Sequence, residues 1–458
     1  MTDLTSLYHR APVALQNAAV SAYGLRLRLL REGRVRRREL RRLRETQWLS
    51  APEIKTRQER RALAMANRAY RSVPLYRDRL PDFHEVSDPR EFSRLPVLEK
   101  HELRTDRKRL VTERFQDDRL QEVHTGGTTG TPLTIYCNRS VLQRNYAFFD
   151  RFKEWAGVGR EERVATFAGR NLVPPEQTEP PFWRFNAANR QLLFSSYHIA
   201  PSSVGSYAEE LSHFAPALID SYPSSLRPIA RHIVESGGPE VRPKAVVTSS
   251  ETLDDATRRL IETAFDCPVF DHYGAAEMAA FVTQCAEGTY HVNPEFGLVE
   301  ILEDGEPVQP GEEGEIVATG FINPVMPLVR YATGDRAVAG AEGCGCGRAF
   351  PVIERILGRM DDVLVTPEGR RIGRLDPIFK AVTSFYETRI VQDARDHVVV
   401  EVVAGGPGDP EADETRLREE LGLRLGPSVV IDIERVDSIS RTGRGKLRTV
   451  ENRVVEDA

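Results

Sequence analysis

The sequence is short of cysteine and of long apolar runs, and each shortage excludes a class of protein. Five cysteines among 458 residues are too few for a disulfide framework, so free thiols or metal ligands are the alternatives. No run reaches the roughly 18 apolar residues that a membrane-spanning helix needs. The segment Met1–Gln16 lacks the apolar centre of a secretory signal, so we expect a cytoplasmic protein.

A strong positive charge is also missing. The net charge of -5 gives no support to a general nucleic-acid binder. The composition, with 40% hydrophobic and 29% charged residues, is ordinary for a globular protein. A chain of 458 residues predicts two or three domains. Nothing in the sequence indicates an oligomeric state.

The most distinctive stretch present is Thr125–Pro132, which reads T-G-G-T-T-G-T-P. Glycine allows a close backbone approach, and successive N–H groups with threonine hydroxyls around them favour anions. The candidate phosphate-binding residues are Thr125, Gly126, Gly127, Thr128, Thr129 and Gly130. No Lys-Ser/Thr pair follows, so this is not a Walker loop. Taken alone, the stretch also fits a simple hairpin turn.

The N-terminal region is rich in arginine. From Leu25 to Arg44, arginines alternate with leucines, which predicts a solvated helix lying on a larger domain. A basic amphipathic surface for a membrane or an acidic partner is the alternative. Ser50–Glu53 fits a capping box with proline near the helix start, and the helix should run to about Arg71.

The middle of the chain alternates between strand and helix patterns, which indicates parallel α/β units. Asn138–Trp155 and Asp254–Phe265 have helical spacing. The strand Ala245–Thr248 ends in S-S-E, and the strand Pro268–Asp271 ends in H-Y-G. Ligands bind at the carboxyl ends of such strands, so these ends are candidate site positions.

Further on, the pattern changes to short antiparallel strands. Alternating runs between His291 and Leu328 are separated by turn signals and predict a small barrel or sandwich. We therefore expect an α/β fold with two domains. A large N-terminal domain would cover residues 1–358, including a helical segment over 1–115, and a small mobile α+β domain would cover 359–458.

Five motifs occur in a fixed order. They are T-G-G-T-T-G from Thr125, Y-G-A-A-E from Tyr273 to Glu277, Y-A-T-G-D from Tyr331 to Asp335, G-R-M-D-D from Gly358 to Asp362, and R-T-G-R-G-K from Arg441 to Lys446. Together they resemble the adenylate-forming superfamily of acyl-CoA synthetases, luciferases and peptide-synthetase adenylation domains.

A narrower resemblance is to the phenylacetate–CoA ligase branch, in particular the CapK-like capsular polysaccharide biosynthesis proteins. The features that carry it are L-Q-N from Leu15, V-P-L-Y-R from Val73, C-G-C-G-R from Cys344, and a short C-terminal domain. The resemblance covers nearly the whole chain.

The resemblance implies that a carboxylate attacks the α-phosphorus of ATP, expels pyrophosphate, and is then transferred to coenzyme A. Lys446 and Glu277 would be catalytic, with Glu277 also holding Mg²⁺, and Asp361 would be the hinge. The glycine loop would hold the β- and γ-phosphates. The other nucleotide-binding residues would be Ser250, Glu251, His272, Tyr273, Gly274, Ala275, Asp335 and Arg359.

Two departures from the family pattern leave alternatives open. Ala276 stands where the superfamily usually has Thr or Ser, so Ser249 or Ser250 would have to supply a hydroxyl. Val365–Gly369 replaces a lysine-containing segment near the acceptor site, which leaves the acceptor open. An amine or hydroxyl of a sugar or natural-product intermediate, or a carrier protein, is the alternative to coenzyme A. A non-catalytic nucleotide-binding scaffold is a second alternative.

Residues for the organic acid are harder to identify. Arg170, Tyr197 and Tyr222 are our candidates for the substrate pocket. The aromatic residues Phe182, Trp183, Phe185 and Phe194 would suit an aromatic acid or ordinary core packing equally well. The sequence does not identify the acid.

A second group of residues fits a metal. Cys285, His291, Cys344 and Cys346 offer three thiolates and an imidazole, which suit a closed, structural Zn²⁺ site. Similar sites in the phenylacetate–CoA ligase branch support this interpretation. The alternative is cysteines packed as small apolar residues, which we expect for Cys137 and Cys267.

Overall fold

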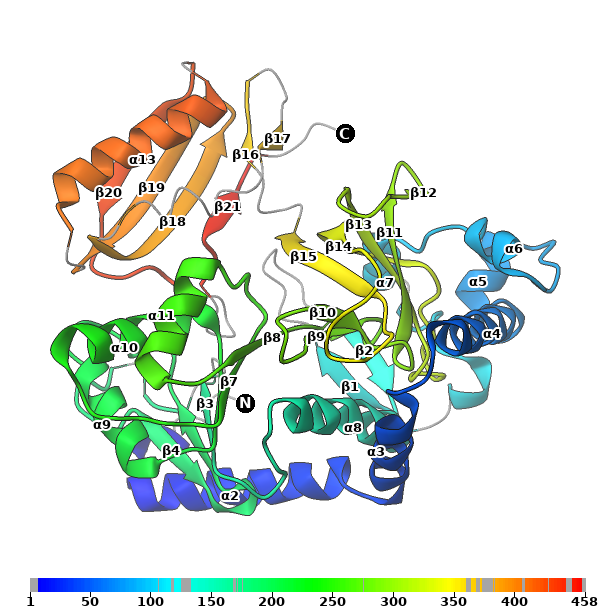
Figure 1. The fold of residues 1–458 in the computed structure, drawn as a ribbon, viewed down its shortest axis with the longest axis horizontal. Coiled ribbons are helices and arrows are strands. Elements are labelled where there is room, and N and C mark those ends of the chain that lie inside the picture. The colour runs from blue at the N-terminus through cyan, green and yellow to red at the C-terminus, as the bar shows by residue number, and fades with distance from the viewer. Residues whose placement is uncertain are drawn as a thin grey trace.

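The computed structural model describes most of the chain. It covers residues 7–105, 107–116, 119–124, 133–167, 170, 172–174, 176–274, 276–359, 364–367, 371–372, 382, 384–405, 408–426, 428–441 and 447–454. Figure 1 shows two parts, with the C-terminal strands and helix above a larger body of sheet and helices. No helix in the described ranges is long and apolar enough to cross a membrane.

Helices dominate the described part of the N-terminal region. They are α2 (Val13–Arg31), α3 (Arg34–Thr46), α4 (Ala51–Ser72), α5 (Pro74–Arg79), α6 (Pro89–Ser93) and α7 (Lys100–Thr105). The arginine-rich stretch is thus divided between two helices that separate at Glu32 and Gly33. Our prediction of a single helix over Leu25–Arg44 was therefore wrong. The predicted capping box of Ser50 and Glu53 is confirmed at the start of α4.

A thirteen-stranded sheet forms the body. Its parallel half runs in the order β5 (Gln191–Phe194), β3 (Val164–Phe167), β6 (Leu218–Ser221), β7 (Ala245–Ser249) and β8 (Val269–Gly274). Strand β4 (Trp183–Asn186) lies antiparallel at the edge. The helices of this half are α8 (Arg139–Trp155), α9 (Val204–Phe214), α10 (Pro223–Ser236) and α11 (Asp255–Phe265).

The predicted antiparallel strands are present, but they extend the same sheet instead of forming a barrel of their own. They are β9 (Phe281–Gln284), β10 (Tyr290–Val292), β11 (Gly297–Glu303), β12 (Glu306–Pro307), β13 (Glu313–Gly320), β14 (Tyr331–Ala339) and β15 (Val352–Arg359). The pairing of β8 with β9 joins the two halves, and β12 is the far edge. The alternation of apolar and polar residues predicts that a segment is a strand, but it does not show which other strands it pairs with.

Short elements complete the body. The strands β1 (Gln121–His124) and β2 (Thr134–Cys137) pair with each other on either side of the glycine loop, and η1 (Glu113–Phe115) and η2 (Ala187–Asn189) are single turns. Two of the four aromatic candidates pack in the core: Phe182 and Phe194 are buried, and Phe194 stacks on Phe167 with ring centroids 4.5 Å apart. Ordinary packing therefore explains these two residues.

The C-terminal part has its own core. Strands β18 (Phe385–Ala394), β19 (His397–Ala404), β20 (Val430–Arg435) and β21 (Val450–Asn452) form one sheet, and β16 (Leu364–Val365) and β17 (Arg371–Ile372) form a small hairpin. Helix α13 (Pro410–Leu425) covers the sheet. Alternate valines of β19 and the leucines of α13 at positions 417, 421 and 425 are fully buried together. Every second residue of a strand lies on the same face, and so do helix residues four positions apart, which explains this packing.

Candidate active site and metal centre

The candidate site residues gather at one edge of the sheet. Strands β3, β5, β6, β7 and β8 are parallel, so their carboxyl ends lie at the same edge. Ser250 and Glu251 directly follow β7. His272, Tyr273 and Gly274 are the last residues of β8, which ends three residues later than we predicted. The observed strand order thus brings distant sequence motifs together.

Two pairs of polar side chains link β8 to the antiparallel half. The hydroxyl of Tyr273 donates to Asp335 Oδ2 at 2.8 Å, and the hydroxyl of Tyr331 donates to Glu277 Oε1 at 3.0 Å. Burial, with Asp335 close by, raises the pKa of Tyr273 well above its ordinary value, so its hydroxyl keeps the proton that it donates. Both carboxylates are therefore oriented by phenols from the neighbouring motif.

Arg359 lies close to these residues in the backbone. It is the Cα partner of Asp335 where β14 pairs with β15. This places the end of the Y-A-T-G-D motif beside the first two residues of the G-R-M-D-D motif, although more than twenty residues separate them in the chain. The pairing supports a shared role at one end of a ligand.

The imidazole of His272 is buried among aromatic rings. Its ring centroid lies 4.5 Å from Phe281 and 5.2 Å from Phe149, and burial lowers the pKa of His272 to about 3. A Cβ atom on Gly274 would lie 2.6 Å from this ring, which explains why glycine follows Tyr273. His272 is therefore a neutral, packed residue beneath the site.

The C-terminal part touches the same edge of the sheet. The backbone N–H of Leu447 donates to Glu251 Oε1 at 3.1 Å, and Ser224 donates to the same carboxylate through its N–H and its hydroxyl. Arg441 donates to the hydroxyl of Ser224 at 3.4 Å and forms an ion pair with Glu387. In this arrangement Glu251 is a contact between the two parts.

Sequence reasoning missed Ser224 and Glu387, and it treated Arg441 only as the start of a motif. Burial raises the pKa of Glu387, and the charge of Arg441 opposes that rise. Ser224 and Glu387 lie 163 positions apart and belong to no recognisable motif. Of these three residues, Arg441 alone belongs to a recognisable sequence motif, and its side chain contacts the other two.

Some predicted residues lie outside the described part of the chain. They are Thr125, Gly126, Gly127, Thr128, Thr129, Gly130, Ala275, Asp361 and Lys446. Their roles stay predictions. Strands β1 and β2 flank the glycine loop, so the backbone brings His124 and Leu133 near each other on its two sides.

The three substrate-pocket candidates follow neighbouring parallel strands. Arg170, Tyr197 and Tyr222 come after β3, β5 and β6, at the carboxyl edge that also carries Glu251. Burial raises the pKa of Tyr197, and the nearby Arg441 opposes this rise. Tyr197 therefore lies close to the docked C-terminal segment, while Arg170 is solvent exposed.

The metal-ligand candidates form a compact group. One ligand atom from each of Cys285, His291, Cys344 and Cys346 lies within 4.8 Å of all the others. Cys285 Sγ is 3.6 Å from Cys344 Sγ, and Cys346 Sγ is 3.4 Å from His291 Nε2. A tetrahedral zinc would separate two thiolates by about 3.8 Å and a thiolate and an imidazole by about 3.5 Å. The four residues therefore fit zinc.

The surroundings of Cys344 favour a thiolate. Burial opposes ionisation, but the hydrogen bonds that Cys344 makes with Thr289 and with neighbouring groups outweigh it, so the pKa of Cys344 is lowered. The other two cysteines differ, because burial raises the pKa of both Cys137 and Cys267 to about 12. Cys137 is fully buried and Cys267 is partly buried, in line with the expected packing role.

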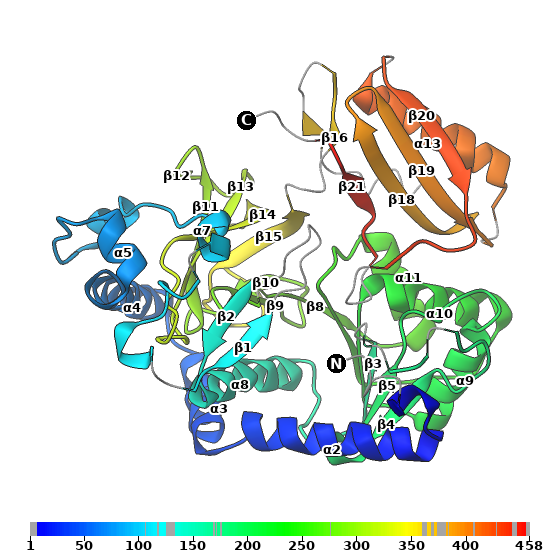
Figure 2. The ribbon, with the colours of Figure 1, turned by 180° about the vertical axis from the view of Figure 1, so that it is seen from behind.

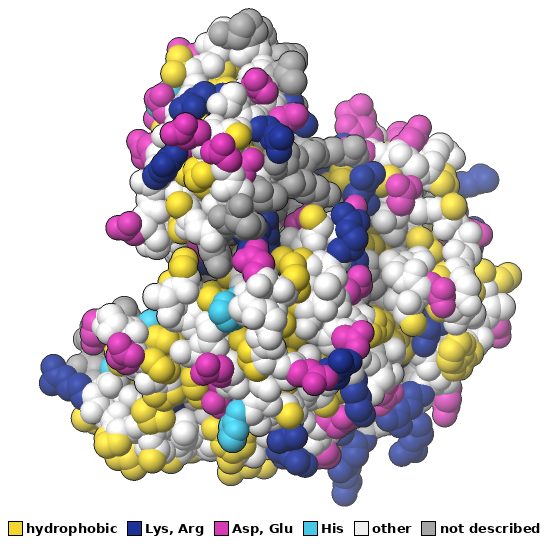
Figure 3. Space-filling model, turned by 60° about the vertical axis from the view of Figure 1, so that its left-hand side comes forward, with side chains coloured by type: hydrophobic (Ala, Val, Ile, Leu, Met, Phe, Trp, Pro, Cys, Tyr) yellow, Lys and Arg dark blue, Asp and Glu magenta, His cyan; other side chains and the backbone are white. Residues whose placement is uncertain are grey.

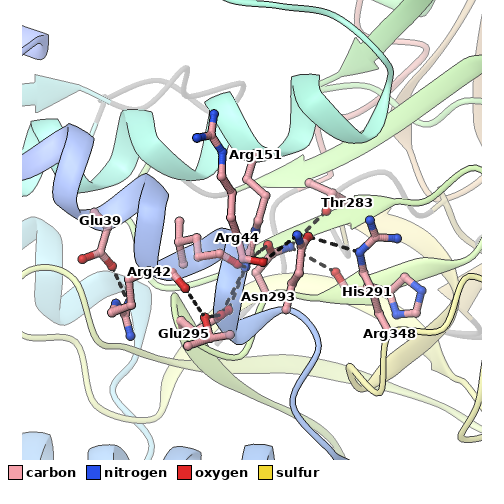
Figure 4. A network of polar contacts seen from close by, with 12 residues as sticks. Glu39, Arg42, Arg44, Arg151, Thr283, His291, Asn293, Glu295 and Arg348 are labelled. Carbon is pink, nitrogen blue, oxygen red and sulfur yellow. Dashed lines mark hydrogen bonds and ion pairs between the residues drawn. The ribbon is translucent and has the colours of Figure 1, made fainter.

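A buried polar network connects the candidate metal centre to the N-terminal helices (Figure 4). Arg151 of α8 is almost fully buried and donates to both oxygens of Glu295 at 3.1 Å. Thr46, the last residue of α3, also donates to Glu295, and Asn293 accepts from Arg151. Because Asn293 is two residues from His291, the network holds the metal-side strand against α3 and α8.

Comparisons with known proteins agree with this arrangement. Residues 364–453 match the family described as the CapK C-terminal domain. Protein CapK of Staphylococcus aureus is 28% identical over 463 aligned residues, which cover 98% of this chain and 100% of CapK. The phenylacetate–coenzyme A ligase of Escherichia coli K12 is 25% identical over 69% of this chain and 73% of its own.

A solved structure has the same fold. A 2-hydroxyisobutyryl-CoA ligase in the postadenylation state, in complex with R3-HIB-AMP, superposes with a TM-score of 0.69 at 21% identity. The match covers 88% of this chain and 90% of that one. The chain is thus similar to CapK over nearly its whole length and to a phenylacetate–coenzyme A ligase over 69% of it, its residues 364–453 match the CapK C-terminal domain family, and its fold is that of the 2-hydroxyisobutyryl-CoA ligase.

Proposed function

We propose that the chain activates a carboxylic acid with ATP, forms an acyl-adenylate with release of pyrophosphate, and transfers the acyl group to a thiol, with coenzyme A as first choice. One observation carries this proposal. The pairs Tyr273–Asp335 and Tyr331–Glu277 converge at the sheet edge where Leu447, next in the chain after Lys446, contacts Glu251. Ligands bind at this edge in open α/β sheets.

Each group has a chemical task in this reaction. Glu277 is a buried carboxylate with one oxygen held by Tyr331, which suits a hard cation such as Mg²⁺ bound also to phosphate oxygens. Asp335 would accept hydrogen bonds from the ribose hydroxyls, with Tyr273 beside the adenine. Thr125–Gly130 would donate to the phosphates. Lys446 would bring a positive charge to the α-phosphate and the incoming carboxylate, where negative charge develops.

The relatives support this choice of chemistry. The names of the E. coli relative and of the structural neighbour describe coenzyme A ligases, and the neighbour carries an adenylate. We do not transfer their acids to this chain. Residues 1–358 and 359–458 would be the two domains, with Asp361 as the hinge between them.

Two further assignments belong to the proposal. Cys285, His291, Cys344 and Cys346 would hold a structural zinc, because their separations fit a tetrahedral shell without an open position. An amine, hydroxyl or carrier-protein acceptor is the second candidate function. The segment Val365–Gly369 favours it, because it lacks the lysine found near the acceptor site in the wider superfamily.

The first test is ATP–pyrophosphate exchange with a panel of aryl, alkyl and amino acids. We expect exchange with one class of acid, and a loss of about 10²-fold or more in Lys446→Ala, since a charge aimed at the reacting phosphate is removed. Lys55→Ala, in the exposed part of α4, is the matched control and should keep full exchange. Tight ATP binding without exchange for any acid would favour the nucleotide-binding scaffold instead.

A further inference from the structure

Helix α2 is attached to the body through its polar side. Asn17 Oδ1 accepts the N–H of Phe185 at 2.9 Å, and Ser21 Oγ accepts the N–H of Ala187 at 3.0 Å. Arg28 donates to the carbonyl of Ala188 at 2.7 Å, and buried Gln16 accepts from Arg184. These contacts cover the free edge of β4, which protects an edge strand from pairing with another chain.

The opposite side of α2 is apolar and faces solvent. Its exposed residues recur at helical spacing: Leu15, Ala18, Ala19, Ala22, Leu25, Arg26 and Leu29. Leu15 is 61% exposed, Leu25 is 51% exposed and Leu29 is 63% exposed. A surface helix normally has the reverse orientation, with apolar residues toward the core. An apolar face as long as this 19-residue helix, roughly 28 Å, marks an interaction surface.

Helix α3 adds positive charge beside this apolar face. Arg34, Arg37, Arg38 and Arg41 recur on one side of the helix and are all exposed. Within the described ranges, none of these four nor Arg26 has an acidic partner at ion-pair distance, whereas Arg36 and Arg44 pair with Asp150 and Glu154. Along the lower edge of Figure 3, hydrophobic side chains lie next to a group of Lys and Arg.

We propose that this surface, formed by the exposed residues of α2 and α3 and called here the α2–α3 surface, docks reversibly on an anionic phospholipid bilayer. Leucines on a helix that lies flat enter the boundary between headgroups and acyl chains, and arginines pair with lipid phosphates. A second copy fits less well, because two-fold pairing would collect unpaired arginines in one interface. The unpaired arginines therefore favour an anionic bilayer over a second copy of the chain as the partner.

Docking in this way would leave the candidate active site open. Figures 1 and 2 both show α2 along the lower edge of the molecule and the C-terminal strands at the upper edge. A bilayer below α2 thus lies on the far side from the contact between Leu447 and Glu251. The proposal does not depend on the reaction assigned above, and membrane binding should leave adenylation unchanged.

The experiment is co-sedimentation of the full chain with vesicles of phosphatidylcholine alone and of phosphatidylcholine mixed with phosphatidylglycerol. We expect binding to the mixed vesicles only, weakened by added salt. Leu25→Glu with Leu29→Glu should weaken binding by about tenfold or more. Arg37→Glu with Arg38→Glu should weaken it by about fivefold for each arginine removed.

A matched control comes from the C-terminal part. Val430→Glu with Arg395→Glu changes one exposed apolar and one exposed basic residue there, and it should bind vesicles like the unchanged protein. Circular dichroism confirms that each variant is folded. Absent binding, equal binding to both kinds of vesicle, or equal loss in the control would overturn the proposal. So would a dimer in solution that the leucine variants dissociate without any vesicle binding.

Discussion

At the scale of single residues, the candidate site combines carboxylates at the edge of the sheet with a neutral, packed histidine next to them. His272 has three aromatic neighbours from α8 and β9, namely Phe149, Phe152 and Phe281. Its Nε2 has no hydrogen-bond partner among the described residues. A charged imidazolium in this position would lose its hydration without any compensating contact.

This environment predicts a pH dependence of stability. The pKa of His272 falls from 6.5 to about 3 on folding, so the unfolded chain binds the proton more strongly. The contribution of neutral His272 to the free energy of unfolding is fully present above pH 6.5. It is lost as the pH falls toward about 3, at up to about 1.4 kcal/mol per pH unit. Urea unfolding measured across this range gives the free energy of unfolding at each pH.

The substitution His272→Phe keeps an aromatic ring in the pocket and removes the titrating group. We expect the free energy of unfolding of this variant to depend less on pH than that of the unchanged protein. His84→Gln, at an exposed position, is the control and should keep the original slope. If the slope of His272→Phe also stayed the same, another group would cause the acid sensitivity.

At the scale of elements, the proposed zinc would connect segments that the sequence keeps apart. Cys285 follows β9 and His291 lies in β10, whereas Cys344 and Cys346 lie between β14 and β15. Strand β10 pairs with both β9 and β15, so the metal would sit where the hairpin and the loop meet. Metal bound only by the folded chain adds about 4 kcal/mol of stability when free zinc exceeds the Kd a thousandfold.

We therefore expect about one zinc per purified chain, measured by metal analysis, and a loss of zinc with a lower thermal midpoint in Cys344→Ser. Cys267→Ser is the matched control, because Cys267 lies outside the cluster and should keep the metal. A natively folded preparation without zinc, or full zinc retention in Cys344→Ser, would exclude the structural metal site.

The elements also show how far the sequence could predict the structure. Local signals worked: the Ser50 capping box, the helix from Arg139 to Trp155, and the alternating valines of β19 follow from short-range spacing. Contacts between distant residues could not be predicted in this way. The ion pair of Arg151 with Glu295, for example, depends on how α8 packs against the chain after β10. The arginine-rich stretch was predicted as one helix from Leu25 to Arg44, but it is divided between α2 and α3.

The candidate site shows the same division. The motifs identified Tyr273, Glu277 and Asp335, because each motif is local and the strand ends bring them together. Ser224 could not be found, because its role depends on Arg441 reaching it from the C-terminal part. Residues in a contact between two separately folded parts have no common sequence pattern.

At the scale of the whole molecule, the chain passes from one folded part to the other over a very short distance. Arg359 still pairs with Asp335 in the large sheet, whereas Leu364 is fully buried in the C-terminal core. Val365 is fixed to the C-terminal sheet by hydrogen bonds of 2.7 Å to and from Gln392. Arg359 and Leu364 thus belong to different parts, and Asp361, the proposed hinge, lies between them in the sequence.

A rotation would break the contacts between the two parts, which include the bond from the Leu447 N–H to Glu251 at 3.1 Å and two longer ones, while contacts inside the C-terminal part would move with it. Arg441 donates to Ser224 at 3.4 Å and Arg231 donates to the carbonyl of Phe385 at 3.5 Å, both near the limit for a hydrogen bond. The stronger ion pair of Arg441 joins it to Glu387, within the C-terminal part. The ion pair of Arg441 with Glu387 would therefore be kept if the C-terminal part rotated as proposed.

Asp361→Pro fixes one backbone dihedral at the hinge, whereas Asp361→Ala leaves both free. If the rotation separates the two half-reactions, the proline variant should keep most of its ATP–pyrophosphate exchange. Its thioester formation with coenzyme A should fall by about tenfold more than its exchange, because only the second step needs the other arrangement. The alanine variant should affect the two steps much less. Equal loss of both half-reactions in the proline variant would show that Asp361 supports the fold of the site and is not a hinge.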